Sequence, residues 1–182
     1  MNKVQLNHYN NDTYNPGSTF KKTLWYLANM FFFKTLLPFP SSLKIQLLKL
    51  FGAKVGKGVV IKPNVNIKYP WFLEMDDNCW IGEGVWIDNL ASVKIGSNVV
   101  LSQGVYLLTG SHDYKKESFD LILGEIVLEY GVWIGAKAVV CPSVVCKSHS
   151  VLAVDSVATQ DLEPYGIYQG NPAIKKRTRI IK

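Results

Sequence analysis

Aliphatic residues recur at every sixth position through the middle of this chain. The phased positions are Val55, Ile61, Ile67 and Leu73, then Ile81 and Ile87, then Ile95, Leu101 and Leu107, then Ile134, Val140, Cys146, Leu152 and Ala158. A period of six is neither the two-residue alternation of an ordinary sheet nor the 3.6-residue period of a helix. A fixed period of this kind indicates a repeat architecture.

The repeat has a direct physical interpretation. Each six-residue unit forms a short strand and a tight corner, and three units close one triangular coil. Equivalent strands of successive coils pair about 4.8 Å apart, while the aliphatic residues point inward and glycine or small polar residues supply corners. A coil cannot bury its apolar face alone, so several coils stack and the ends need caps. The pattern therefore predicts an all-β solenoid, a parallel β-helix, over residues 53–162.

Residues 1–52 are predicted to be an N-terminal extension and helical cap. A first helix follows a polar turn that ends at Ser18, with Ser18 or the next residue as its N-cap, and a proline at position 38 ends it. A second helix runs from the serine pair 41–42 to Gly52. The apolar positions of the first helix recur at helical spacing: Leu24, Leu27, Ala28, Phe31 and Phe32.

Two roles fit the aromatic and basic residues of segment 20–40. The segment can cap the solenoid and pack on a neighbouring subunit, which is the role we favour. It can instead contact a membrane surface, because aromatic side chains lie beside lysines. The apolar stretch 24–37 is too short to span a bilayer, which needs about 20 apolar residues.

The six-residue rhythm breaks between Leu107 and Ile134. Residues 109–126 are predicted to leave the coil as an excursion loop, and function is commonly found where a regular solenoid is interrupted. After the β-helix, residues 163–182 are predicted to form a short, basic C-terminal tail.

Net charge and cysteine content limit the possible binding partners only partly. The 182 residues carry a net charge of +6, which alone fits nucleic acid, an anionic membrane or a phosphorylated ligand. No arginine-rich run or zinc spacing is present, so we expect no nucleic-acid partner. Three cysteines without a C-x-x-C spacing argue against a disulfide framework. We expect a cytoplasmic protein, with peripheral contact at the inner membrane surface as the alternative.

Several segments together identify a resemblance. They are W-I-G-E-G-V-W-I-D-N-L (80–90), I-G-S-N-V-V-L-S-Q-G-V-Y-L-L-T-G-S-H-D-Y (95–114), G-V-W-I-G-A (131–136) and G-N-P-A (170–173). With them, the chain resembles the hexapeptide-repeat acyltransferases, in the colanic-acid-biosynthesis acetyltransferase branch near the maltose and galactoside O-acetyltransferases. The resemblance implies a left-handed coil and a homotrimer with interfacial sites. It also implies acetyl-CoA as acyl donor, a hydroxyl acceptor on a sugar or polysaccharide precursor, and no metal.

The predicted catalytic residue is His112. Acyl transfer from a thioester to an alcohol needs a base for the hydroxyl proton, and imidazole suits this task near neutral pH. His112 lies at the mouth of the excursion, on the match to the family's catalytic histidine, whereas His8 and His149 are predicted to be surface residues. No G-x-S-x-G motif or histidine-paired cysteine is evident, so we expect direct transfer without an acyl-enzyme.

Asp88 and Asn89 are the predicted acceptor-binding residues. They interrupt the apolar rhythm one coil below His112, where they can bind acceptor hydroxyls or orient the imidazole. A merely polar corner is an equally weighted alternative. Asp113 and Glu117 are further candidates for orienting the imidazole.

The resemblance supplies the donor site. The implied CoA-binding residues are Trp133, Gly135, Ala136, Ala153, Val154, Thr159, Lys176 and Arg177. Backbone amides at the coil edge would pair with the pantetheine amides, and a cation is needed for the 3′-phosphate. Arg177 matches the family's basic position best, with Lys175 and Lys176 as neighbours able to share the role.

The sequence is also compatible with two other functions and argues against a third. The acceptor can be the amine of an amino sugar nucleotide, because nothing in the sequence selects oxygen over nitrogen. A non-catalytic β-helix binding protein is the second alternative. A γ-carbonic-anhydrase-like metalloenzyme shares the fold but needs three histidines converging on a metal, a placement that His8, His112 and His149 lack.

Overall fold

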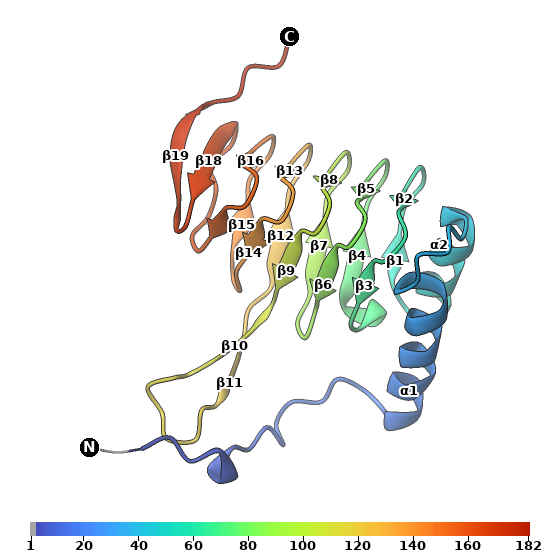
Figure 1. The fold of residues 1–182 in the computed structure, drawn as a ribbon, viewed down its shortest axis with the longest axis vertical. Coiled ribbons are helices and arrows are strands. Elements are labelled where there is room, and N and C mark those ends of the chain that lie inside the picture. Colours follow the sequence, from blue (N-terminus) through green and yellow to red (C-terminus); the bar gives the residue numbers. More distant parts are fainter. Residues whose placement is uncertain (1–2) are drawn as a thin grey trace.

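The computed structural model describes residues 3–182, and its body is the left-handed parallel β-helix predicted from the sequence (Figure 1). Sheet A contains β1 (Lys54–Val55), β4 (Leu73–Met75), β7 (Val93–Ile95), β12 (Ile126–Leu128) and β15 (Val145–Cys146). Sheet B contains β2 (Val60–Ile61), β5 (Trp80–Ile81), β8 (Val100–Leu101), β13 (Trp133–Ile134) and β16 (Val151–Leu152). Sheet C contains β3 (Asn66–Ile67), β6 (Trp86–Asp88), β9 (Tyr106–Leu108), β14 (Val139–Val140) and β17 (Val157–Ala158).

The phased aliphatic residues form the core. Ile61, Ile81, Leu101 and Ile134 stack in register up sheet B, and all four are buried. The small and β-branched residues four positions later, such as Val85, are buried as well. Because every coil adds the same inward row, burial of apolar surface continues from one coil to the next and stabilises the stack.

The corners between sheets C and A differ from the other two sets. Four residues separate consecutive strands at every corner from sheet A to sheet B and from sheet B to sheet C. The C-to-A corners vary in length: residues 68–72, which include the 3₁₀ turn η3 (Pro70–Phe72), and the excursion 109–125 are longer than four residues, whereas 89–92 and 141–144 are not. The excursion forms an antiparallel hairpin of β10 (Gly110–His112) and β11 (Leu121–Leu123), which the sequence did not predict.

Helices cover the open end of the first coil (Figure 1). After the short 3₁₀ turn η1 (Leu6–His8), α1 (Thr19–Ala28) continues into the π-helical turn η2 (Asn29–Phe33), and α2 (Ser41–Leu50) follows. Ser18 caps α1 as predicted, its hydroxyl accepting a hydrogen bond from the Lys21 amide.

Side chains of these helices satisfy the unpaired edge of the first coil. The Trp25 Nε1 group donates to the Ile67 carbonyl at 2.8 Å. The Lys44 ammonium, fully buried, donates to the Ile61 and Lys62 carbonyls at 3.4 and 2.9 Å. These bonds replace the strand that a further coil would have supplied, so the edge is not left free to pair with another chain.

The buried face of α1 and η2 is not the one that the apolar spacing indicates. Trp25, Asn29 and Phe33 face the β-helix, and Ala28 and Phe32 are partly buried against the core. The outer stripe is exposed and contains Phe20, Leu24 and Leu27 of α1 and Phe31 of η2. The physical reason is that the helix turns its hydrogen-bonding side chains toward the strand edge. No helix within residues 3–182 combines the length and apolarity needed to cross a membrane.

The C-terminal segment is a hairpin rather than the predicted tail. β18 (Gly166–Gly170) adds to sheet B beside β16, and β19 (Ala173–Thr178) folds back antiparallel on it. The Arg179 guanidinium then donates to the Gly131 and His149 carbonyls at 3.0 and 3.3 Å. The hairpin covers the last coil because that coil, like the first, has an edge to protect.

Candidate functional site

His112 is held in one tautomer by its hairpin. Its ring stacks on Phe119 with centroids 4.5 Å apart, and Tyr9 packs against it at 5.7 Å. The His112 Nδ1 atom lies 2.8 Å from the Phe119 carbonyl oxygen. A carbonyl can only accept, so Nδ1 carries the proton in that bond and Nε2 keeps its lone pair. The geometry therefore presents Nε2 as the basic nitrogen.

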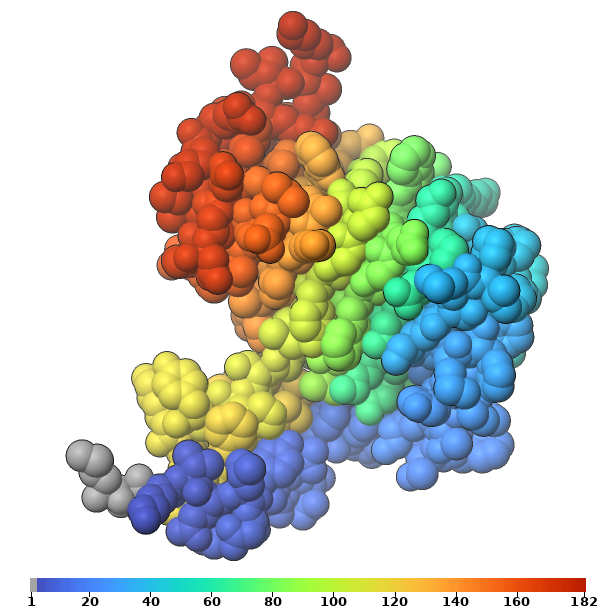
Figure 2. Space-filling view, in the orientation of Figure 1, coloured from blue at the N-terminus to red at the C-terminus, as the bar shows by residue number. Residues whose placement is uncertain are grey.

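An N-terminal strap, residues 3–17, braces the excursion. The Gln5 amide donates to the Glu117 carbonyl at 2.9 Å, and the His8 Nδ1 atom lies 3.1 Å from the Glu117 carboxylate. Figure 2 shows the strap and the excursion as one lobe projecting from the β-helix. Glu117 thus pairs with His8, and Asp113 bonds within its own turn to Lys115. Within residues 3–182, neither carboxylate is hydrogen-bonded to His112.

Asn89 fastens two successive C-to-A corners together. Its buried side-chain oxygen accepts from the Tyr69 amide at 3.0 Å, and its nitrogen donates to the Tyr69 carbonyl at 2.6 Å. One coil later, the Thr109 hydroxyl donates to the Asp88 carbonyl at 2.8 Å and accepts from the Ala91 amide at 3.0 Å. The excursion therefore begins at a corner that is hydrogen-bonded to the corners below it. The Asn89 side-chain amide makes its hydrogen bonds within the protomer.

Asp88 is buried beside one lysine and two tyrosines. Only 8% of the residue is exposed, with Oδ1 3.3 Å from Lys68 Nζ and Oδ2 accepting from the Tyr106 hydroxyl at 3.4 Å. Burial, and then the Asp88 charge, raises the pKa of Tyr106 to about 12. Burial also raises the pKa of Tyr14, with smaller contributions from Tyr69 and Asp88. Both phenols therefore stay protonated near neutral pH.

One oxygen of Asp88 is buried without a well-directed hydrogen bond. Although Oδ1 lies within ion-pair distance of Lys68, it accepts no such bond from residues 3–182 and has almost no accessible surface. A buried carboxylate oxygen of this kind is unusual in a folded protein. The Lys68 ammonium therefore compensates its charge without completing its hydrogen bonding.

Asp88 and His112 lie on the same edge but do not touch. Asp88 pairs with Leu108 across β6 and β9, and His112 follows Leu108 by four residues. Four extended residues span at most about 14 Å. The C-to-A side of the coil therefore carries both residues, and His112 lies within about 14 Å of Leu108, the strand neighbour of Asp88.

Four of the predicted donor-site residues gather at two consecutive B-to-C corners, namely Gly135, Ala136, Ala153 and Val154, and Trp133 lies on β13 just before the first of them. A Cβ atom on Gly135 would lie 2.6 Å from the Val154 amide nitrogen, so only glycine permits this close stacking of corners. Trp133 is 46% exposed, and its Nε1 donates to the Ser102 hydroxyl at 2.9 Å. Val154 is exposed beside them.

The remaining predicted donor-site residues lie outside these corners, at the C-terminal end of the β-helix. Thr159 is exposed after β17, at the C-to-A corner. Lys176 and Arg177 are exposed on β19, and neither has a carboxylate within ion-pair distance among residues 3–182. Lys175 is instead paired with Glu163 at 2.6 Å. In the same part of the chain, no three histidine, cysteine or carboxylate side chains gather as metal ligands.

Comparison with known proteins gives the family. No protein-family model matches the chain. The curated colanic acid biosynthesis acetyltransferase WcaF of Escherichia coli (strain K12) is 35% identical over 164 residues, which cover 90% of each chain. The chain belongs to this acetyltransferase family. A galactoside O-acetyltransferase of the same organism is 28% identical over 130 residues, covering 70% of this chain and 64% of the relative.

Solved structures share the fold of this acetyltransferase. A hexapeptide-repeat acetyltransferase from Vibrio cholerae, complexed with acetyl-CoA, superposes with a TM-score of 0.80 at 22% identity and covers 90% of this chain and 91% of its own. A galactoside acetyltransferase in complex with CoA gives a TM-score of 0.72 at 24% identity, covering 87% of this chain and 78% of its own.

Sequence reasoning missed several residues around the site of the acetyltransferase. Lys68 lies twenty positions before Asp88, which is one full coil, so counting coils would have placed it next to the aspartate. Tyr9, Tyr14 and Phe119 lie outside the repeat, and no period links them to the site.

Proposed function

We propose that this acetyltransferase transfers the acetyl group of acetyl-CoA to a hydroxyl of a sugar or polysaccharide precursor, with His112 as general base. The observation that carries the proposal is the bond between His112 Nδ1 and the Phe119 carbonyl, which leaves Nε2 basic. The names of the similar colanic acid and galactoside enzymes support a sugar acceptor.

The proposed reaction is a direct transfer. Nε2 of His112 takes the acceptor hydroxyl proton while the oxygen attacks the thioester carbonyl. The tetrahedral intermediate collapses, the carbon–sulfur bond breaks, and the CoA thiolate leaves and regains a proton from the imidazolium. The chain's own thiols are poor nucleophiles, because burial raises the pKa of Cys79, Cys141 and Cys146.

Acceptor chemistry is tested by following CoA release with a panel of sugars and amino sugars. Release with hydroxyl acceptors supports the proposal. Release with amino sugars alone would make the enzyme an N-acetyltransferase, and the absence of both release and acetyl-CoA binding would make it a binding protein.

Trp133→Ala is expected to raise the Kd for acetyl-CoA by about 5- to 30-fold. The half-exposed indole flanks the stacked corners at Gly135, and losing an aromatic contact costs about 1–2 kcal/mol. Isothermal titration calorimetry measures the change. Trp80→Ala is the matched control, since Trp80 is exposed in the same row of sheet B two coils earlier. Equal Kd values for both variants would contradict the proposed donor site.

The same proposal includes a homotrimer with sites between subunits. It is supported by the resemblance to the hexapeptide-repeat acyltransferases, which implies interfacial sites, and by the exposed apolar side chains of Phe20, Leu24 and Leu27 on α1. Sedimentation equilibrium is expected to give a mass of about three chains. A monomeric protein with full activity would contradict this assembly.

We also propose a cytoplasmic location in which residues 20–40 pack on a neighbouring subunit, with contact at the inner membrane surface as the alternative. The exposed apolar side chains of α1 and η2 fit both roles, with Phe20 and Phe31 exposed by 73% and 62%. Phe20→Ser/Phe31→Ser is expected to lower the oligomer mass. Ile174→Ser, which changes an exposed residue on β19, is the control. An unchanged mass together with loss of flotation on anionic, but not neutral, vesicles would support the membrane surface instead.

A further inference from the structure

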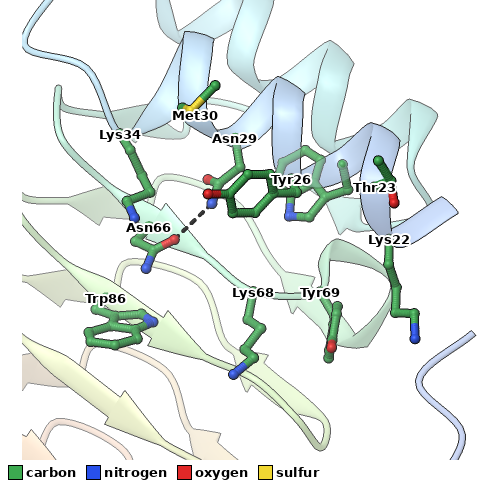
Figure 3. A pocket seen from close by; sticks show the side chains of 11 residues that line it. Lys22, Thr23, Tyr26, Asn29, Met30, Lys34, Asn66, Lys68, Tyr69 and Trp86 are labelled. Carbon is green, nitrogen blue, oxygen red and sulfur yellow. Dashed lines mark hydrogen bonds between the residues drawn. The ribbon is translucent and has the colours of Figure 1, made fainter. Parts of the chain in front are cut away.

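A groove of about 490 Å³ lies between the helical cap and sheet C (Figure 3). Its lining includes Lys22 and Lys34 from the cap, Lys68 after β3, and Trp86 on β6. Volumes of this size are typical of small-molecule sites. The lining contains no carboxylate.

Two of the three lysines that line the groove lack a counter-charge. Among residues 3–182, no carboxylate lies within ion-pair distance of Lys22 or Lys34, while Lys68 has Asp88 at 3.3 Å. The positive charge of the chain is concentrated in the segment that forms the groove. Residues 13–73 contain nine lysines and no acidic residue, whereas residues 74–182 contain ten basic and thirteen acidic residues. Uncompensated like charges that line one groove attract an anion, and lysine ammonium groups bind phosphate.

The other side chains of the groove fit a sugar. Tyr26, Tyr69 and Trp86 present aromatic rings, which can pack against the apolar face of a pyranose. The Asn29 nitrogen donates to the Asn66 side-chain oxygen at 2.7 Å, so the Asn66 nitrogen remains a donor. Figure 3 shows this nitrogen turned away from Asn29, toward the side of the groove where Trp86 lies.

We propose that this groove binds the anionic end of the acceptor, which is a sugar carrying a phosphate or diphosphate ester. The inference rests on the proposed function and names its substrate class. Lys68 connects the groove to the acceptor side, since its ammonium is shared with Asp88 Oδ1. A phosphate that binds Lys68 draws the ammonium away from the carboxylate and leaves Oδ1 free for a sugar hydroxyl.

Two sources offer the same chemistry, a nucleotide-linked sugar and a lipid-linked sugar diphosphate. The test begins with calorimetry at saturating CoA, so that the donor site is filled. Hexose 1-phosphate and pyrophosphate are expected to bind at least 10-fold more tightly than the neutral methyl hexoside. Competition by a nucleoside diphosphate hexose and by a polyprenyl diphosphate hexose in detergent then distinguishes the two sources.

Lys22→Gln/Lys34→Gln is expected to weaken hexose 1-phosphate binding by about 10-fold or more and to reduce its salt dependence, while the Kd for CoA stays unchanged. Lys49→Gln/Lys57→Gln is the matched control, because both lysines are exposed in the same basic segment outside the groove. Equal binding of charged and neutral probes, or equal weakening in the two double variants, would overturn the inference.

The two proposals fail in different ways. Probe binding is measured without acetyl transfer, so an inactive enzyme that binds phosphate sugars would refute the proposed function alone. An enzyme that acetylates neutral sugars with a KM insensitive to Lys22→Gln/Lys34→Gln would keep the function and refute the anionic groove.

Discussion

His112→Ala is expected to lower the rate of acetyl transfer by about 10²- to 10⁴-fold, the range of general-base contributions. The substitution removes the nitrogen that would take the acceptor proton, and nothing replaces it. Asp113 bonds within its own turn, and Glu117 is engaged with His8. Binding of acetyl-CoA is expected to persist, because the predicted donor residues lie on the B-to-C corners.

The measurement is CoA release at saturating acetyl-CoA over a range of pH. His149→Asn is the matched control, since it removes another histidine at a corner with φ of 61°, a backbone conformation that asparagine tolerates. Comparable activity of His112→Ala and the control would refute the general-base role.

Lys44→Ala is expected to lower the free energy of unfolding by about 2–4 kcal/mol. The ammonium of this buried residue bonds the Ile61 and Lys62 carbonyls. The Ile61 carbonyl keeps a long bond from the Ser41 hydroxyl, so the Lys62 carbonyl is the acceptor that loses its partner, at a cost of about 1–3 kcal/mol. The aliphatic stem is packed in the same place, with the ammonium 5.9 Å from the centre of the Phe33 ring. Removing the side chain therefore opens a space at the edge that the cap is there to close.

Thermal unfolding tests this expectation. For a chain of this size each kcal/mol shifts Tm by roughly 2–4 °C, so a decrease of about 5–15 °C is expected. Lys49→Ala is the control, because Lys49 is exposed on the same helix and its loss is expected to change stability by no more than about 0.5 kcal/mol. Equal Tm values for the two variants would show that the Lys44 bonds do not hold the cap.

The repeat makes most of the fold predictable. Inward positions such as Ile81 and Leu101 repeat with the coil, so their burial and pairing follow from the spacing alone. The phase of α1 does not follow from it, because Trp25 and Asn29 are turned inward by hydrogen bonds to β3, and a hydrophobic pattern contains no information on those partners. The C-terminal hairpin was missed because the hydrophobic pattern likewise contains no information on which strand β18 pairs with.

The candidate site divides in a similar way. His112 could be located because the rhythm breaks there and the surrounding residues resemble a known family. Asp88 was found as a polar interruption, but its neighbour Asn89 is used to join corners, a distinction that requires the position of the Tyr69 backbone. The strap that carries Tyr9 and Tyr14 folds back over a long stretch of sequence, and only the structure shows where it docks.

The confinement of every insertion to the C-to-A corners has a consequence for how such enzymes diversify. Lengthening or replacing residues 109–125 leaves the four-residue corners that carry Gly135 and Ala153 in register. Under the proposed function, exchange of this loop would change acceptor preference while the corners of the proposed donor site keep their register. A β-helix whose variable loops lie at one set of corners can change these loops without changing its buried core.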